Sequence, residues 1–237
     1  MGQSYFIWKN RDCRSMGVWM QGPAAIIRPE ERAEHVQIPG RDGDLTQLEG
    51  AEVYNSYIQT ATILVKGGYR VREVYNWLKG SGYVTFSGEP DRRQPARVIG
   101  AITLQKHAYN LDWWTGEVQW YCQPLKEALQ EAEVSITSSG SHVRNAGDVT
   151  ARPLWKLTPN ASTATIINGG KTFSLSGLTS GTAVLIDSDV MEVTNTARTT
   201  LLTKNSSGDF PVLACGDNTI TGSGWSKIEI TKRERFL

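Results

Sequence analysis

A helical hydrophobic pattern occurs in one stretch of this chain, residues 69–79, and this scarcity of helix is what most constrains the fold. Apolar residues recur there at i, i+3, i+4 and i+7, the spacing of one face of an amphipathic helix. Gly80 follows, where a positive φ can end the helix. The apolar positions are Val71, Val74, Tyr75 and Leu78. Because most of the other regular segments are of β type, we predict a mainly β protein with one helix packed on a sheet.

Long β-type segments dominate the first half. Residues 52–65 are rich in Val, Tyr, Thr and Ile and contain no Gly or Pro, which favours one or two extended strands. Residues 117–122 alternate, with Val118, Trp120 and Cys122 on one face of the predicted strand. Further strands are predicted at residues 4–8, 18–20, 34–38, 83–86 and 96–106.

A domain boundary is predicted near the middle of the chain. Residues 125–133 favour helix, but the segment is short and its apolar face is narrow, so a linker turn is the alternative. A Ser-rich run without periodicity follows at residues 135–141. The length of 237 residues also exceeds the usual size of one domain. We therefore predict an N-terminal β domain at residues 1–133 and a C-terminal domain at residues 134–237.

The second half has short β segments separated by Gly, Asn, Ser and Thr. Asn168-Gly169-Gly170 predicts a hairpin turn, and strands at residues 183–187 and 191–194 are expected to pair. The other predicted strands are residues 154–157, 163–167, 172–175, 210–213, 218–221 and 227–231. Strands this short, with almost no helix, predict an antiparallel sandwich of the jelly-roll type.

Residues 38–45 are expected to form a shaped loop, neither strand nor helix. Turn residues set its backbone, and its charged side chains suit a contact with something outside its own domain. The alternative is an ordinary hairpin connection, because Asp-Gly is a common turn dipeptide. The candidate interface residues are Pro39, Gly40, Arg41, Asp42, Gly43 and Asp44.

Composition and motifs give no sign of catalysis. The 25 basic and 24 acidic residues leave a formal charge of +1, so there is no global electrostatic case for binding nucleic acid or an anionic membrane. The 3 histidines are scattered, and no nucleophile, phosphate-loop or dinucleotide motif follows a predicted strand. No catalytic, cofactor-binding or metal-ligating residue is predicted, and neither a membrane span nor a targeting signal is expected. The 3 cysteines lack a Cys-x-x-Cys pair, which predicts reduced, mostly buried thiols.

Two other functions remain open at this point. Among the 8 tryptophans, Trp155 and Trp225 are candidates for stacking on sugars in a carbohydrate-binding adhesin module, although tryptophans more often fill cores. Asp187 and Asp189 suggest the acid and base of a β-sandwich hydrolase, although two Asp residues in a turn are usually turn formers.

Three landmarks give the chain a family resemblance. They are Ile38-Pro39-Gly40-Arg41-Asp42-Gly43-Asp44-Leu45, the run from Asn145 to Pro153, and the closing segments at residues 208–213, 216–220 and 232–235. In this order, with the amphipathic helix between the first two, the chain resembles the distal tail proteins of long-tailed, non-contractile bacteriophages. The resemblance implies an N-terminal β domain that forms a homohexameric ring and a galectin-like C-terminal sandwich outside it.

The resemblance also implies a structural role and a set of partners. Such a ring joins the tail tube protein to the tail tip protein, and DNA passes through its lumen without specific binding, which agrees with the near-neutral charge. The implied location is the virion tail, assembled in the host bacterial cytoplasm and encoded by a phage or a prophage. The loop from Pro39 to Asp44 would supply a charge-complementary part of one ring contact.

Overall fold

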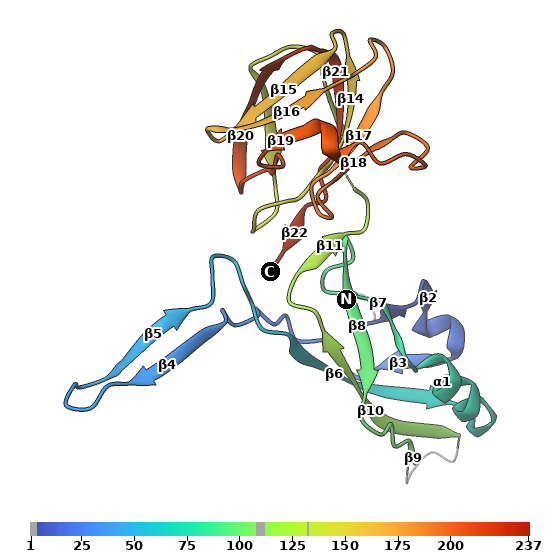
Figure 1. The fold of residues 1–237 in the computed structure, drawn as a ribbon. Helices are drawn as coiled ribbons and strands as arrows, with labels where there is room; N and C mark the ends of the chain where they lie inside the picture. The colour runs from blue at the N-terminus through green and yellow to red at the C-terminus, as the bar shows by residue number, and fades with distance from the viewer. Residues whose placement is uncertain (1–3, 108–111, 132) are drawn as a thin grey trace. The chain divides into compact units, whose positions relative to one another are not determined.

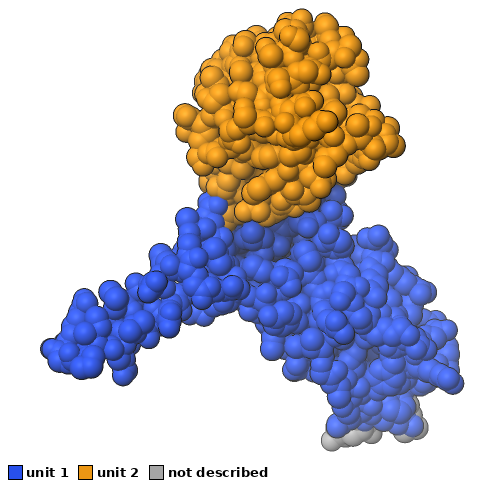
Figure 2. All heavy atoms as spheres, in the orientation of Figure 1, with its two compact units in different colours: residues 1–129, 237 blue, residues 130–236 orange. Residues whose placement is uncertain are grey.

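The structure is a computed structural model that describes residues 4–107, 112–131 and 133–237 (Figure 1). It divides the chain into two compact units: unit 1 is Met1–Leu129 with Leu237, and unit 2 is Gln130–Phe236 (Figure 2). The predicted boundary between residues 133 and 134 lies close to this division. Strands dominate both units, which confirms the mainly β fold class.

An antiparallel sheet forms the framework of unit 1. Its strands are β1 (Phe6–Trp8), β2 (Arg11–Asp12), β3 (Val18–Met20), β6 (Tyr57–Lys66), β7 (Ser81–Phe86), β8 (Arg92–Ile99), β9 (Gln105–Lys106), β10 (Trp113–Cys122) and β11 (Lys126–Ala128). The main path runs β2-β1-β7-β8-β10-β6-β3, with β9 beside β10 and β11 beside β8. The 3-10 turn η1 (Cys13–Met16) leads into β3.

Among the described strands of this sheet, β6 and β10 share the longest pairing. The two strands pair antiparallel from Trp113–Lys66 to Cys122–Tyr57. Val118, Trp120 and Cys122 are all fully buried, which confirms the predicted alternation. The run predicted as strand from residue 52 begins later, at Tyr57, because Glu52 adopts φ of 58° and cannot continue an extended strand.

The predicted helix is confirmed as α1 (Val71–Trp77), which follows the 3-10 turn η2 (Gly68–Arg70). Val74 and Leu78 are buried in the core of unit 1. Trp77 stacks on Phe6 with ring centroids 5.5 Å apart. The indole nitrogens of Trp77 and Trp8 each donate to the other's backbone carbonyl, at 3.2 and 3.1 Å. These contacts fix the helix on one face of the sheet.

A separate two-stranded hairpin also belongs to unit 1. It consists of β4 (Ala33–Gln37) and β5 (Asp44–Leu48), and Figure 1 shows it extending away from the rest of the unit. We call residues 33–48 the arm.

Unit 2 is a sandwich of two antiparallel five-stranded sheets with a shared hydrophobic core. One sheet has the order β12-β21-β14-β17-β18, formed by β12 (Glu133–Ile136), β21 (Trp225–Thr231), β14 (Leu154–Pro159), β17 (Val184–Asp187) and β18 (Glu192–Asn195). The other has the order β13-β20-β15-β16-β19, formed by β13 (Ser141–Asn145), β20 (Gly216–Ser223), β15 (Thr163–Asn168), β16 (Lys171–Ser176) and β19 (Ser206–Gly208). The 3-10 turn η3 (Thr203–Asn205) and β22 (Arg235–Phe236) complete the unit. The predicted β-sandwich is confirmed.

Two predicted hairpins of the sandwich are present. Gly169 and Gly170 have φ of 57° and 76°, the positive values of a type I′ turn between β15 and β16. β17 and β18 pair as expected, from Val184–Asn195 to Asp187–Glu192.

Other local predictions were wrong. Residues 125–133, expected as helix or linker turn, contain β11 and the start of β12. The reason is that Glu127 pairs with Arg93, a distant partner on β8 that the local sequence does not indicate. Residue 132 lies outside the described residues. Residues 210–213, expected as a strand, make an isolated bridge at Leu213. By contrast, the prediction of mostly buried thiols is confirmed, because Cys13 and Cys122 are buried and Cys215 is exposed.

Candidate functional site

The arm places the predicted interface residues together at an exposed tip. Arg41 donates its backbone N–H to the Ile38 carbonyl at 3.1 Å, and Gly40 and Gly43 adopt φ of 80° and 76°. The loop is therefore the tip of a hairpin. All six candidate residues, Pro39, Gly40, Arg41, Asp42, Gly43 and Asp44, are exposed.

The prediction that residues 38–45 contain no strand was wrong at the last two positions. Asp44 pairs with Gln37, and Leu45 pairs with Val36, so both belong to β5. The signal was present in the sequence, because a strand predicted at residues 34–38 and followed by a turn requires a partner strand immediately beyond that turn.

One face of the arm carries exposed apolar side chains next to its tip. The cross-strand pair Val36–Leu45 shares that face with Ile38, and the three side chains are 38%, 43% and 39% exposed. On the other face, His35 Nδ1 lies 3.1 Å from the Thr46 hydroxyl. A two-stranded hairpin in water is marginally stable at best. Covering the apolar face with a partner would therefore stabilise the arm.

Hydrogen bonds hold the base of the arm. Arg32 donates its backbone N–H to Val53 O at 2.9 Å and accepts from Glu49 N at 3.1 Å. Asn55 donates to Glu30 O at 2.8 Å. The base is thus fixed by backbone bonds, whereas the tip has no such support from the rest of unit 1 among the described residues.

The arm and its base are acidic. Residues 28–55 contain 7 carboxylates against 3 arginines, a net charge of −4. Within the described residues, an ion pair at 3.6 Å joins Arg32 and Glu49, whereas Glu34, Asp42 and Asp44 are exposed and form no salt bridge.

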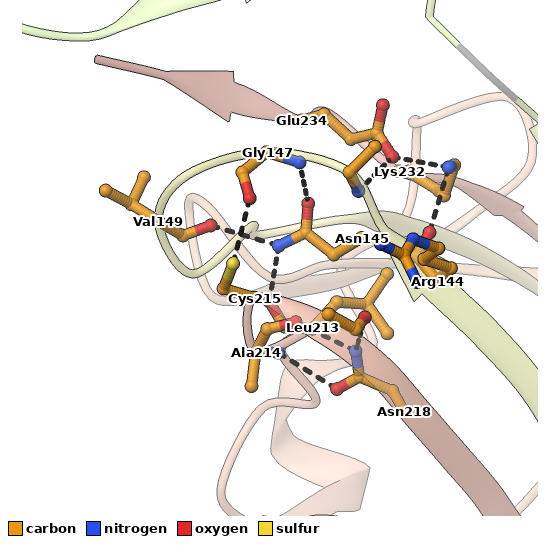
Figure 3. A network of polar contacts seen from close by, with 12 residues as sticks. Arg144, Asn145, Gly147, Val149, Leu213, Ala214, Cys215, Asn218, Lys232 and Glu234 are labelled. Carbon is orange, nitrogen blue, oxygen red and sulfur yellow. Dashed lines mark hydrogen bonds and ion pairs between the residues drawn. The ribbon is translucent and has the colours of Figure 1, made fainter.

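The second landmark, which begins at Asn145, forms a buried polar network in unit 2 (Figure 3). Asn145 is 1% exposed, and its side-chain nitrogen donates to Val149 O at 3.0 Å and Leu213 O at 3.1 Å. Its side-chain oxygen accepts from Gly147 N at 2.9 Å. Asn218 binds the neighbouring turn in the same way, since it accepts from Ala214 N and donates to Ala214 O. These amides replace strand hydrogen bonds in two tight loops.

The closing landmark supports the same loops. Glu234 accepts from Ala146 N at 2.9 Å and pairs with the largely buried Lys232, whose amine also donates to Arg144 O. These contacts, together with the Asn145 network, give the landmark residues of the second half a structural role.

The two carboxylates considered as a catalytic pair are held by arginines. Asp187 forms a bidentate pair with Arg233, at 2.6 and 3.0 Å, and Asp189 pairs with Arg235 at 2.6 Å. Burial raises the pKa of the Asp187 carboxyl, but the hydrogen bonds and charge of Arg233 outweigh burial and leave that pKa below its ordinary value. A general acid needs the opposite shift at neutral pH. The pair therefore stabilises the sandwich and does not resemble an acid–base site.

The two tryptophans considered for sugar stacking lie in the sandwich core. Trp155 is 0% exposed and donates to Ser188 Oγ and Pro211 O, at 3.1 and 3.0 Å. Trp225 is 7% exposed and donates to Thr165 O at 3.1 Å. Neither ring has a free face on which a pyranose could stack, so the structure corrects this hypothesis for both residues.

The described residues offer no group of three or more His, Cys, Asp or Glu side chains suited to hold a metal ion. None of their helices has the length and apolar character needed to cross a membrane.

Comparison with known proteins shows which solved structures share this fold. No protein-family model and no curated protein matches the chain. Among solved structures, it is similar to the Dit protein of phage SPP1, a paradigm of the hub adsorption apparatus in phages infecting Gram-positive bacteria, with a TM-score of 0.77, 17% identity and 100% of both chains covered. The baseplate of phage p2 in its activated conformation gives a TM-score of 0.47 at 9% identity, covering 99% of each chain. The similarity to the SPP1 protein shows that the chain has, over its full length, the fold of a phage distal tail (Dit) protein.

Proposed function

We propose that this chain is a structural protein of a phage tail, in which copies form a hexameric hub ring at the distal end. The observation that carries the proposal is the similarity in fold, over the full length of both chains, to a protein of a phage hub. In this proposal unit 1 forms the ring and unit 2 lies outside it. The partners are further copies of the chain, the tail tube protein and the tail tip protein.

The arm supports ring formation on physical grounds. A closed ring needs a heterologous contact, in which two different patches of each copy meet. The apolar face made by Val36, Ile38 and Leu45 would supply affinity, and the exposed tip from Pro39 to Asp44 would supply direction through its charges. Both parts lie on one hairpin, so a single element can form one side of the contact.

The proposed ring is a conduit in the virion tail, assembled in the host bacterial cytoplasm and encoded by a phage or a prophage. DNA passes through its lumen without specific binding. A formal charge of +1 suits this role, because a strongly basic lumen would hold the phosphate backbone.

Negative-stain microscopy and light scattering of the purified chain test the proposal. We expect six-fold rings, and a protein that stays monomeric at all accessible concentrations would refute the hub-ring function. Replacing Val36 and Leu45 together with Ser should leave a folded chain by circular dichroism but disrupt the rings, because both side chains point out from the arm. Leu201→Ser is the matched control, since Leu201 is an exposed leucine outside the arm, at 59%.

A further inference from the structure

Unit 1 carries a basic surface around α1. Residues 66–79 contain 4 basic side chains and 1 acidic side chain. Lys66, Arg72 and Lys79 are exposed, and Arg70 is half-buried. Lys9, in the turn that follows β1, extends the surface, because its amine donates to the Lys79 carbonyl at 2.8 Å. We call these five residues the basic surface.

The charges of the basic surface are not neutralised within the described part of the chain. None of the five residues forms a salt bridge there. Three of the cations lie over aromatic rings instead: Lys9 over Trp8 at 5.5 Å, Arg70 over Tyr69 at 5.4 Å and Lys66 over Trp113 at 5.9 Å. Rings hold the side chains in place without cancelling their charge.

The basic surface also has an apolar component. Tyr69, whose hydroxyl accepts from Arg70 at 3.0 Å, is 78% exposed, and Tyr75 on α1 is 38% exposed. Exposed tyrosines beside arginine are typical of protein interfaces. The surface therefore combines net positive charge with apolar area, whereas the arm combines net negative charge with apolar area.

Charge is separated within unit 1. Residues 28–55 have a net charge of −4, whereas the rest of unit 1 has 12 basic and 7 acidic side chains, a net charge of +5. Figure 1 draws the arm and α1 at opposite ends of unit 1, so an arm does not reach the α1 of its own chain.

We propose that the acidic arm of one copy binds the basic surface of the next copy. The inference rests on the proposed ring and names the second of its two complementary patches. Glu34, on the same face of the arm as Val36, and Asp42 and Asp44, at its tip, supply the negative charge that the basic surface of the neighbour attracts. The apolar side chains of the arm pack near Tyr69. Charge complementarity then fixes the direction of the ring, and each copy donates one arm and accepts one.

Reciprocal charge reversal tests the contact. The first variant carries Glu34→Lys, Asp42→Lys and Asp44→Lys, and the second carries Lys66→Glu, Arg72→Glu and Lys79→Glu; all six positions are exposed, so both variants should fold. We expect each variant alone to lose the ring at a concentration at which the unaltered chain is assembled. In an equimolar mixture, every contact in an alternating ring is again between opposite charges. Rings should therefore return, with equal numbers of the two variants by native mass spectrometry.

The outcomes separate this inference from the proposed function. If the unaltered chain forms no ring, the proposed function fails. If the unaltered chain forms rings but either reversed variant also does, or the mixture does not recover them, the ring stands and the arm–basic surface contact is overturned. Arg198→Glu with Lys204→Glu, two exposed cations of unit 2, is the matched control and should leave the rings intact.

Discussion

Replacing Asn145 with Ala should destabilise unit 2, because this buried amide bonds three backbone groups. The side chain is 1% exposed, and it makes three hydrogen bonds: to Val149 O at 3.0 Å, to Leu213 O at 3.1 Å and from Gly147 N at 2.9 Å. Alanine removes all three and leaves two carbonyls and one N–H without this partner in a buried loop (Figure 3).

The magnitude follows from that count. A hydrogen bond contributes about 0.5–1.5 kcal/mol net, and a buried group left without a partner adds to the cost, so the loss should be about 2–4 kcal/mol. Asn145→Asp should cost at least as much, because a carboxylate cannot donate to the Val149 and Leu213 carbonyls and would face both at hydrogen-bond distance.

Native-state hydrogen exchange with mass spectrometry measures this loss in each unit separately, which matters because two units need not unfold together. A loss of about 2–4 kcal/mol corresponds to exchange about 30- to 700-fold faster in β13 and β20. Peptides from β6 and β10 of unit 1 serve as the internal reference. Asn160→Ala is the control, since Asn160 is an exposed residue of the same sandwich, and it should change exchange by less than about threefold.

The reasoning is refuted if Asn145→Ala leaves the exchange of β13 and β20 as slow as Asn160→Ala does. That result would mean that the loop's backbone finds other partners at little cost, and that the landmark asparagine does not hold the sandwich together.

Three further predictions follow from the same geometry. Gly147→Ala should lower the unfolding free energy of unit 2 by about 1–3 kcal/mol, because the added Cβ would lie 2.5 Å from Arg235 O. Gly88→Ala is the control: its Cβ would meet no heavy atom within 4 Å, so urea unfolding should show almost no change. The stabilisation from the Asp187–Arg233 pair should be complete above pH 3.8, the ordinary carboxyl pKa, and should be lost as pH falls through the lower pKa of the folded state. The difference in unfolding free energy between the unaltered chain and Asp187→Asn should therefore shrink as pH falls below 3.8. A difference that does not change with pH would contradict the pairing. Raising the salt concentration from about 0.1 M to about 1 M shortens the screening length from about 10 Å to about 3 Å. Light scattering should therefore show weaker ring assembly at high salt. Unchanged or stronger assembly would contradict a charge-directed contact.

Local patterns in the sequence determined part of this protein without the tertiary structure. The apolar spacing of Val71, Val74 and Leu78 predicted α1, and the alternation around Trp120 predicted the buried face of β10. Asn168-Gly169-Gly170 predicted the turn of β15–β16. These features depend on residues within one turn of helix or one strand of each other, so neighbouring residues carry the whole signal.

The tertiary structure alone decided which side chains are buried and which pair. The sequence left Trp155 and Trp225 as candidates for sugar stacking, but both rings are buried in the sandwich core. Asp187 looked like a turn residue or an acid until Arg233, 46 positions away, reached it. Asn145 bonds Leu213 across 68 positions. The physical reason is that burial and pairing depend on which distant segments meet. Whether they meet is set by the free energy gained in burying the whole core, balanced against the entropy lost in closing long loops. No short stretch of sequence contains that information.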